Sequence, residues 1–160
     1  MKILLKILSV LSLAACSTMQ SSDPSSLFFD IPEGSTLTLN KKLEIPQQST
    51  HALIQAGKSL AGNNKNEYEI NCRFDVKAFG PRTIEPETFR IRRTEDGSEW
   101  FSYPTIKRFY TILYLDSDKG TDVLTMECQQ WGDGIDRNFT VAEMVEAVGD
   151  YFSFNLTPGN

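Results

Sequence analysis

The sequence predicts a mainly β protein, either an antiparallel β-sandwich or a partly closed barrel, with one short C-terminal helix. Three observations support this fold class. Residues 68–78 alternate between apolar and polar side chains, further short apolar segments are separated by turn-forming residues, and one helix-capping pattern lies near the C-terminus. Many short strands with a single late helix are typical of such folds.

The first apolar positions of the domain share one parity. They are Leu37, Leu39, Leu43 and Ile45, and Pro46 follows them. The pattern predicts one long interrupted strand, or a hairpin that turns near residues 40–41, ended by the proline. A short strand is expected over residues 51–55.

The clearest strand lies in residues 68–78, where apolar side chains on even positions alternate strictly with polar ones on odd positions. Period two over this length predicts a half-buried antiparallel strand. Gly80 and Pro81 are expected to end it.

Further strands are predicted after Glu85-Pro86, where Phe89 and Ile91 share a face. Asp96-Gly97 is a hairpin signal and predicts a turn before the aromatic residues Trp100, Phe101 and Tyr103. Residues 106–115 are apolar on both parities, which predicts a central strand covered on both faces. A later long strand, ending near residue 131, directs three side chains inward: Leu124, Met126 and Cys128.

The helix is predicted by a capping box in which Thr140 caps the amide of Glu143 and Glu143 reaches back. Gly149 suits the C-terminal cap. The expected apolar stripe consists of Ala142, Val145 and Val148. A short final strand is expected around Phe152 and Phe154.

The N-terminus has the pattern of an export signal. Lysines at positions 2 and 6 begin an apolar run that closes on Leu13-Ala14-Ala15-Cys16. This run is too short and wrongly flanked for a stable membrane span. The tetrapeptide resembles the lipobox of bacterial lipoproteins. The resemblance implies cleavage before Cys16 and acylation of that residue, and two or more acyl chains anchor a protein stably.

These expectations divide the chain into a signal peptide (1–15), a lipidated N-terminus with a flexible Ser-rich tether (16–27), and a single β-rich domain (28–160). Ser17 follows the lipidated cysteine, and in the lipoproteins that this chain resembles serine implies sorting to the outer membrane. We therefore expect an outer-membrane anchor with the domain facing the periplasm. The alternative is a soluble secreted protein whose signal happens to end in cysteine.

The charge balance argues against nucleic acid as a partner. Loss of Lys2 and Lys6 with the signal leaves 14 basic and 21 acidic side chains, a net charge of −7 against −5 for the full chain. Nucleic-acid surfaces require the opposite sign. A cationic protein partner would be favoured.

Two cysteines remain after Cys16. Cys72 and Cys128 both share strand parity with inward apolar neighbours, and an exported protein meets an oxidising compartment. We expect a disulfide if their strands are neighbours, and two separate buried thiols otherwise. A metal site is not expected, because only His51 could join them. No cofactor is expected.

A group of basic residues forms the one charge feature of interest: Arg73, Lys77, Arg90, Arg92 and the pair Lys107-Arg108. If their strands pair, they form a cationic stripe that could bind the phosphates of a glycolipid or an acidic envelope protein. The alternative is a solvated sheet face neutralised by Glu69, Asp75 and Glu99.

Catalytic patterns are weak. Residues 52–59 resemble a phosphate-binding loop without its first glycine, and residues 116–127 resemble a calcium loop with displaced ligands; turns are expected at both. His51 is the single histidine of the chain and has no nucleophile elbow to serve. Glu85 and Glu87 are interpreted as solvated loop charges. We therefore do not expect an enzyme.

Four segments are similar to small uncharacterised lipoproteins of Gram-negative bacteria: residues 37–45, the Cys72 strand, residues 84–89 and the Cys128 segment. This similarity spans most of the mature domain and implies no activity. Size, acidity and paired cysteines are also similar to lipoprotein inhibitors of lysozyme, although their Ser-Gly-x-x-Tyr pattern is not found. We expect a non-enzymatic binding or envelope-assembly module, with an inhibitor of a cationic hydrolase such as lysozyme as the alternative.

Overall fold

The computed structural model describes residues 21–157. The signal sequence and Cys16 lie outside the described residues. In chain order the elements are β1 (Thr36–Leu39), β2 (Leu43–Ile45), β3 (His51–Gln55), β4 (Lys58–Leu60), β5 (Asn71–Val76), β6 (Arg82–Ile84), β7 (Glu87–Ser102), β8 (Ile106–Ser117), β9 (Val123–Gly132), α1 (Val141–Val148), the 3₁₀ turn η1 (Gly149–Tyr151) and β10 (Phe152–Asn155).

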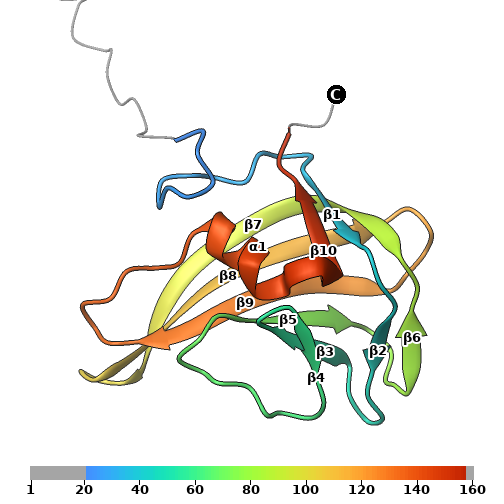
Figure 1. Ribbon diagram of the computed structural model, residues 1–160, viewed down its shortest axis with the longest axis horizontal. Coiled ribbons are helices and arrows are strands. Elements are labelled where there is room, and N and C mark those ends of the chain that lie inside the picture. Colours follow the sequence, from blue (N-terminus) through green and yellow to red (C-terminus); the bar gives the residue numbers. More distant parts are fainter. Residues whose placement is uncertain (1–20, 158–160) are drawn as a thin grey trace, which may run out of the picture.

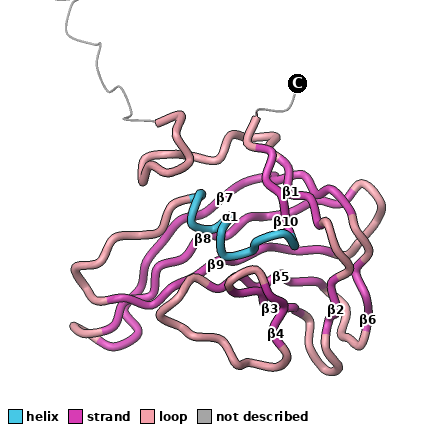
Figure 2. The backbone as a smooth tube through the Cα atoms, viewed as in Figure 1, coloured by secondary structure: helices cyan, strands magenta, loops and turns pink. Residues whose placement is uncertain are grey.

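Eight strands form one antiparallel sheet in the order β10-β1-β7-β8-β9-β5-β3-β4, and β2 pairs with β6 in a separate ribbon. The sheet curls into a half-barrel around α1 (Figures 1 and 2). Of the two predicted architectures, the partly closed barrel is therefore confirmed, together with the single short C-terminal helix.

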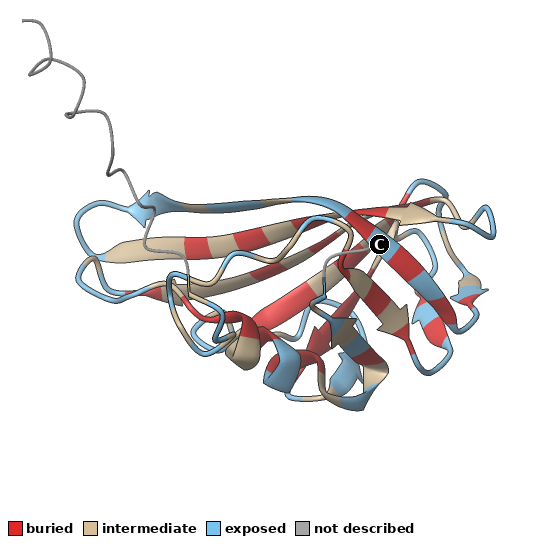
Figure 3. Cartoon of the chain, turned by 90° about the horizontal axis from the view of Figure 1, so that it is seen from above, coloured by how far each residue is buried: buried red, intermediate tan, exposed pale blue. Residues whose placement is uncertain are grey.

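The core lies between the concave face of the sheet and α1. Three fully buried aromatic rings form its centre: Phe74 of β5 lies 5.4 Å from Phe89 of β7 and 5.5 Å from Phe152 of β10, between ring centroids. In the sheet order β5 is separated from β7 by two strands and from β10 by four, so Phe74 meets the other two rings only because the sheet curls. In Figure 3 buried segments alternate with less buried ones along the strands, as period two requires.

The capping box of α1 is confirmed, because Thr140 accepts a bond from the amide of Glu143 and Glu143 accepts one from the amide of Thr140. The predicted stripe is wrong in part, since Val145 is exposed while the buried positions are Val141, Met144, Ala147 and Val148. Sequence spacing alone did not distinguish the two faces.

The end of α1 packs tightly on the β3–β4 turn. The amide of Gly57 donates to the carbonyl of Ala147 at 2.9 Å. A Cβ at Gly149 would lie 2.6 Å from the Cα of Gly57, and both residues have positive φ. Glycine is needed at Gly149 for the backbone conformation and for this close approach.

The predicted turn at Asp96-Gly97 is wrong. β7 runs on to Ser102 and pairs with β8 through Asp96↔Thr111 and Gly97↔Tyr110. A Cβ at Gly97 would lie 2.4 Å from the ring of Tyr110, so this glycine makes room for an aromatic side chain on the partner strand. The hairpin instead turns after Ser102, in residues 103–105.

Two further strand expectations are refined. The segment 36–45 is interrupted, not a hairpin, because β1 joins the large sheet while β2 pairs with β6. β8 is central, as expected, but only one of its faces is covered. Its odd positions from Phe109 to Leu115 are buried, and the even ones are partly exposed.

The predicted disulfide between Cys72 and Cys128 is present. The two residues are opposite each other on the adjacent strands β5 and β9, and both are fully buried. They close a loop with a sequence separation of 56 residues.

Glu87 differs from its interpretation as a solvated charge. Its side chain is buried and accepts hydrogen bonds from the hydroxyl of Ser117, the hydroxyl of Thr121 (2.5 Å) and the amide of Lys119 (3.3 Å). Burial raises the pKa of Glu87, but these bonds outweigh it, so the pKa lies below its usual value. The carboxylate thus holds the β8–β9 turn, in the segment that resembles a calcium loop.

The disulfide should stabilise the fold. The double substitution Cys72→Ala with Cys128→Ala removes a cross-link that restricts the unfolded chain. We expect the free energy of unfolding in urea to fall by roughly 4 kcal/mol. Alkylation of either thiol in the native, unreduced protein would contradict the cross-link.

The hydrogen bonds of Glu87 in the β8–β9 turn should also stabilise the fold. Glu87→Gln should lower the free energy of unfolding by about 1–3 kcal/mol, because an amide nitrogen would then face hydrogen-bond donors in a buried site. Glu85→Gln is the matched control, since exposed Glu85 only pairs with exposed Lys42 at 2.9 Å. It should change stability little.

The contribution of Glu87 should also depend on pH. Its pKa is lower in the folded than in the unfolded protein, so its stabilisation is present above the unfolded pKa and is lost as pH falls through the folded pKa. The difference in stability between wild type and Glu87→Gln should therefore narrow in acid. A difference that widened on acidification would contradict this assignment.

Candidate functional site

The predicted basic residues do not form one stripe. Arg73 and Lys77 belong to β5 and its end, Arg90 and Arg92 belong to β7, and β8 and β9 lie between these strands. Arg90 donates to Asp116 at 3.1 Å, and Arg92 lies 4.0 Å from the same carboxylate. Lys77 is exposed beyond the end of β5.

Arg73 and Arg108 instead belong to a row of alternating charges across four strands. In order across the sheet, the row is Glu99, Arg108, Glu127, Arg73 and Asp75, and each neighbouring pair is in ionic contact. This arrangement fits the neutralised sheet face better than a cationic stripe. Partly exposed pairs of this kind contribute little stability individually.

The residues considered for catalysis have structural surroundings. His51 is partly buried in β3 opposite Asp75, and burial lowers its pKa. The segment that resembles a phosphate-binding loop is the two-residue β3–β4 turn, with Ala56 and Gly57 at positive φ. Within residues 21–157 no group of three or more His, Cys, Asp and Glu side chains is placed to hold a metal ion.

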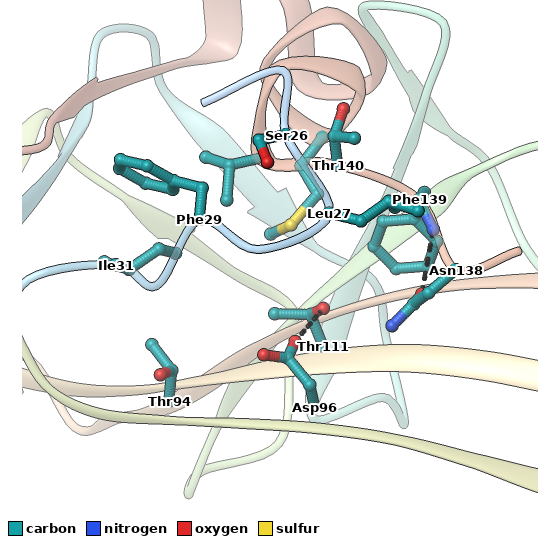
Figure 4. A pocket seen from close by; sticks show the side chains of 12 residues that line it. Ser26, Leu27, Phe29, Ile31, Thr94, Asp96, Thr111, Asn138, Phe139 and Thr140 are labelled. Atoms are coloured by element: carbon teal, nitrogen blue, oxygen red, sulfur yellow. Dashed lines mark hydrogen bonds between the residues drawn. The ribbon is translucent and has the colours of Figure 1, made fainter. Parts of the chain in front are cut away.

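A small cavity lies between the sheet, the start of α1 and the N-terminal segment, residues 21–31 (Figure 4). Its volume is about 140 Å³. Leu27, Phe29 and Ile31 face Asp96 and Thr111 across it, and Thr111 donates a hydrogen bond to Asp96. Sites for drug-sized ligands are roughly 300–1,000 Å³, so this cavity is a packing gap beneath the segment.

The same segment refines the expected tether. Ser26 and Leu27 line the cavity, and the amide of Ala142 donates to the carbonyl of Pro24 at 3.1 Å. Residues 21–27 therefore lie against the domain at the start of α1.

The most unusual surface is at the far end of the β7–β8 hairpin. Trp100, Phe101 and Tyr103 are 44%, 63% and 78% exposed, and Ile135 in the loop after β9 is 96% exposed. Together with Trp131 near the end of β9, these five residues are called the aromatic tip below. A cluster of this kind marks an interaction site more often than a packing accident.

The rings of the tip pack against one another in defined pairs. The rings of Phe101 and Trp131 stack with centroids 4.4 Å apart, and Tyr68 meets Trp131 edge-on at 6.0 Å. Trp100 and Tyr103 meet edge-on at 5.1 Å. Such pairs contribute about 0.5–1.5 kcal/mol each beyond burial, which favours this arrangement of the rings in the absence of a partner.

The backbone packs equally closely against the tip. A Cβ at Gly134 would lie 2.4 Å from the Trp100 ring, so the loop after β9 rests directly on this indole. The ammonium of Lys107 lies 5.7 Å from the same ring. The tip is thus framed by β7, β8, β9 and the loop that carries Ile135.

Sequence reasoning missed this surface because the predicted Asp96-Gly97 turn placed the aromatic residues in an ordinary strand. A signal was available. Trp100 and Phe101 are adjacent and apolar, so they occupy opposite faces of one strand, whereas residues 92–99 contain no large apolar side chain. A strand end that is apolar on both faces, after a polar stretch, indicates an exposed apolar end.

None of the helices in residues 21–157 is long and apolar enough to cross a bilayer. Comparison with family models, with curated proteins and with solved structures finds no match to this chain.

Proposed function

We propose that this protein is a lipid-anchored, non-enzymatic binding module of the cell envelope, held in the outer membrane through acylated Cys16 and facing the periplasm. The aromatic tip is its binding surface. The observation that carries the proposal is this set of mutually packed, exposed rings at one end of an acidic protein.

The anchor is supported by the complete lipobox at Leu13-Ala14-Ala15-Cys16 and by the charged, short apolar run before it. Acyl chains hold a protein at a membrane without any spanning helix. Pro24 accepts a hydrogen bond from the amide of Ala142 and lies eight positions after Cys16, so the connection between the anchor and the domain would be short.

A binding role, rather than a catalytic one, is supported by the structural contacts that these acidic residues and the histidine make. Glu87 holds the β8–β9 turn, Glu85 pairs with Lys42, and Glu127 lies between two arginines. His51 shares a β-ladder position with Asp75. These side chains stabilise the scaffold, whereas the exposed residues of the aromatic tip do not belong to its core.

The basic residues are secondary in this proposal. Arg73, Arg90 and Arg92 are each within 4.0 Å of a carboxylate, so an anionic partner would have to compete with existing ion pairs. Reversal of Arg90 and Arg92 to Glu should leave binding through the tip unchanged.

The proposed anchor depends on one residue, Cys16. Cys16→Ala should leave an uncleaved or soluble protein, because no other side chain at the lipobox can form the thioether. Membrane fractionation and the mass of the mature N-terminus measure this outcome. Cys72→Ala is the matched control, since that cysteine is fully buried in the domain and should not affect acylation. Normal membrane recovery of Cys16→Ala would contradict the proposed anchor.

A further inference from the structure

We infer that the aromatic tip inserts into the interfacial region of the same membrane that holds the acylated Cys16. This inference rests on the proposed function and gives the binding surface an occupant: the lipid headgroup and upper acyl-chain region. The anchor and the tip would then be two contacts of one domain with one bilayer, which fixes the orientation of the domain.

The chemistry of the tip suits that region. Trp and Tyr are enriched at membrane interfaces because each joins an apolar body to a polar group, and Phe and Ile add apolar area. Trp100, Phe101 and Tyr103 are all at least 44% exposed, so no rearrangement is needed to present them. Lys107 lies against Trp100, where its ammonium can stay at headgroup level.

The shape of the tip favours a fluid partner. The rings occupy the end of a protruding hairpin and both of its faces, since Trp100 shares the face of Asp96 while Phe101 stacks on Trp131. A rigid protein partner would need a deep pocket that encloses the hairpin end on two sides. A lipid interface adapts to a convex apolar object without any such pocket.

The position of the chain start is compatible with simultaneous contact. The N-terminal segment and the end of the β7–β8 hairpin lie in the same half of the long axis in Figures 1 and 3, with the hairpin end outermost. Four residues lie between Cys16 and Ser21, so these two residues are at most about 17 Å apart along an extended chain. The short connection keeps Cys16 close to the N-terminal segment, which lies in the same half of the long axis as the tip.

The charges around the tip favour apolar over ionic attachment. Glu99 is paired with Arg108 at 2.8 Å, Lys107 contributes one positive charge, and the adjacent loop carries Asp133 and Asp136. Arg137 of the same loop is paired with Glu143 at 2.7 Å, so among residues 21–157 no excess of positive charge surrounds the tip. We expect binding to zwitterionic lipid that changes little with salt, in contrast to a basic peripheral protein.

The main experiment uses the acylated mature protein in phosphatidylethanolamine–phosphatidylcholine vesicles. The chain has two tryptophans, so Trp131→Phe leaves Trp100 as the single indole at the tip. Its emission should shift to the blue, and lipids brominated near the headgroup should quench it strongly. Raising the salt concentration should leave both signals unchanged.

A matched control places the indole elsewhere. Phe79 is also highly exposed, but it lies next to the start of β9, at the opposite end of that strand from Trp131. Phe79→Trp in a background with Trp100→Phe and Trp131→Phe should give unshifted emission without quenching. Equal quenching of the two reporters would overturn the proposed orientation.

A second measurement uses the unacylated mature chain carrying Cys16→Ser. Phe101→Ser with Tyr103→Ser should reduce its partitioning into the same vesicles by about tenfold or more, because exposed apolar area is removed. Phe79→Ser should have no such effect. Both variants alter exposed side chains, and retained thermal unfolding will show that the fold is intact.

The outcomes separate the two proposals. An unmodified Cys16 by mass spectrometry contradicts the proposed anchor, whatever the vesicles show. An acylated protein whose Trp100 remains unquenched contradicts the membrane insertion of the tip and leaves the anchor standing. Loss of quenching on adding soluble peptidoglycan fragments or a purified envelope protein would also overturn the inference, because the tip would then belong to that partner.

Discussion

The structure depends on covering the concave face of one curled sheet. The rings of Phe74, Phe89 and Phe152 come from strands that are well separated in the sheet, and they meet only because the sheet bends around α1. The helix has eight residues and covers the middle of that face. The capping box sets where the helix begins, the bond from Ala142 to Pro24 holds its start against the N-terminal segment, and the contact of Gly149 with Gly57 holds its end. How far α1 extends along the concave face then decides which parts of the sheet are buried.

The β7–β8 hairpin extends beyond the part of the sheet that α1 and the N-terminal segment cover. β1 pairs with β7 only as far as Arg90, so the rest of β7 is an edge strand that carries charged residues, which discourage pairing with other chains. Beyond Glu99 the character changes to aromatic on both faces. Since neither α1 nor the N-terminal segment extends there, these rings satisfy one another through stacking and remain open to a partner.

Polar groups are used where the sheet has no apolar cover. The buried carboxylate of Glu87 orders the β8–β9 turn, because it accepts hydrogen bonds from Ser117, Lys119 and Thr121. The row from Glu99 to Asp75 joins four strands across the outer face with alternating charge. Arg73 and Arg108 are thereby neutralised by the carboxylates on either side of them.

The sequence by itself determined the features that depend on local pattern: the half-buried strand around Cys72, the capping box at Thr140, the short final strand and the facing parity that allowed the disulfide. These follow from side-chain period and from hydrogen bonds within a few residues. The tertiary structure decided what depends on distant partners. The role of Gly97 is set by the ring of Tyr110 on the partner strand, and the buried state of Glu87 is set by a turn that lies thirty residues later. The aromatic tip was decided in the same way: exposure at Trp100 depends on where the cover over the concave face ends, and Phe101, on the opposite face, meets Trp131 of a strand distant in sequence.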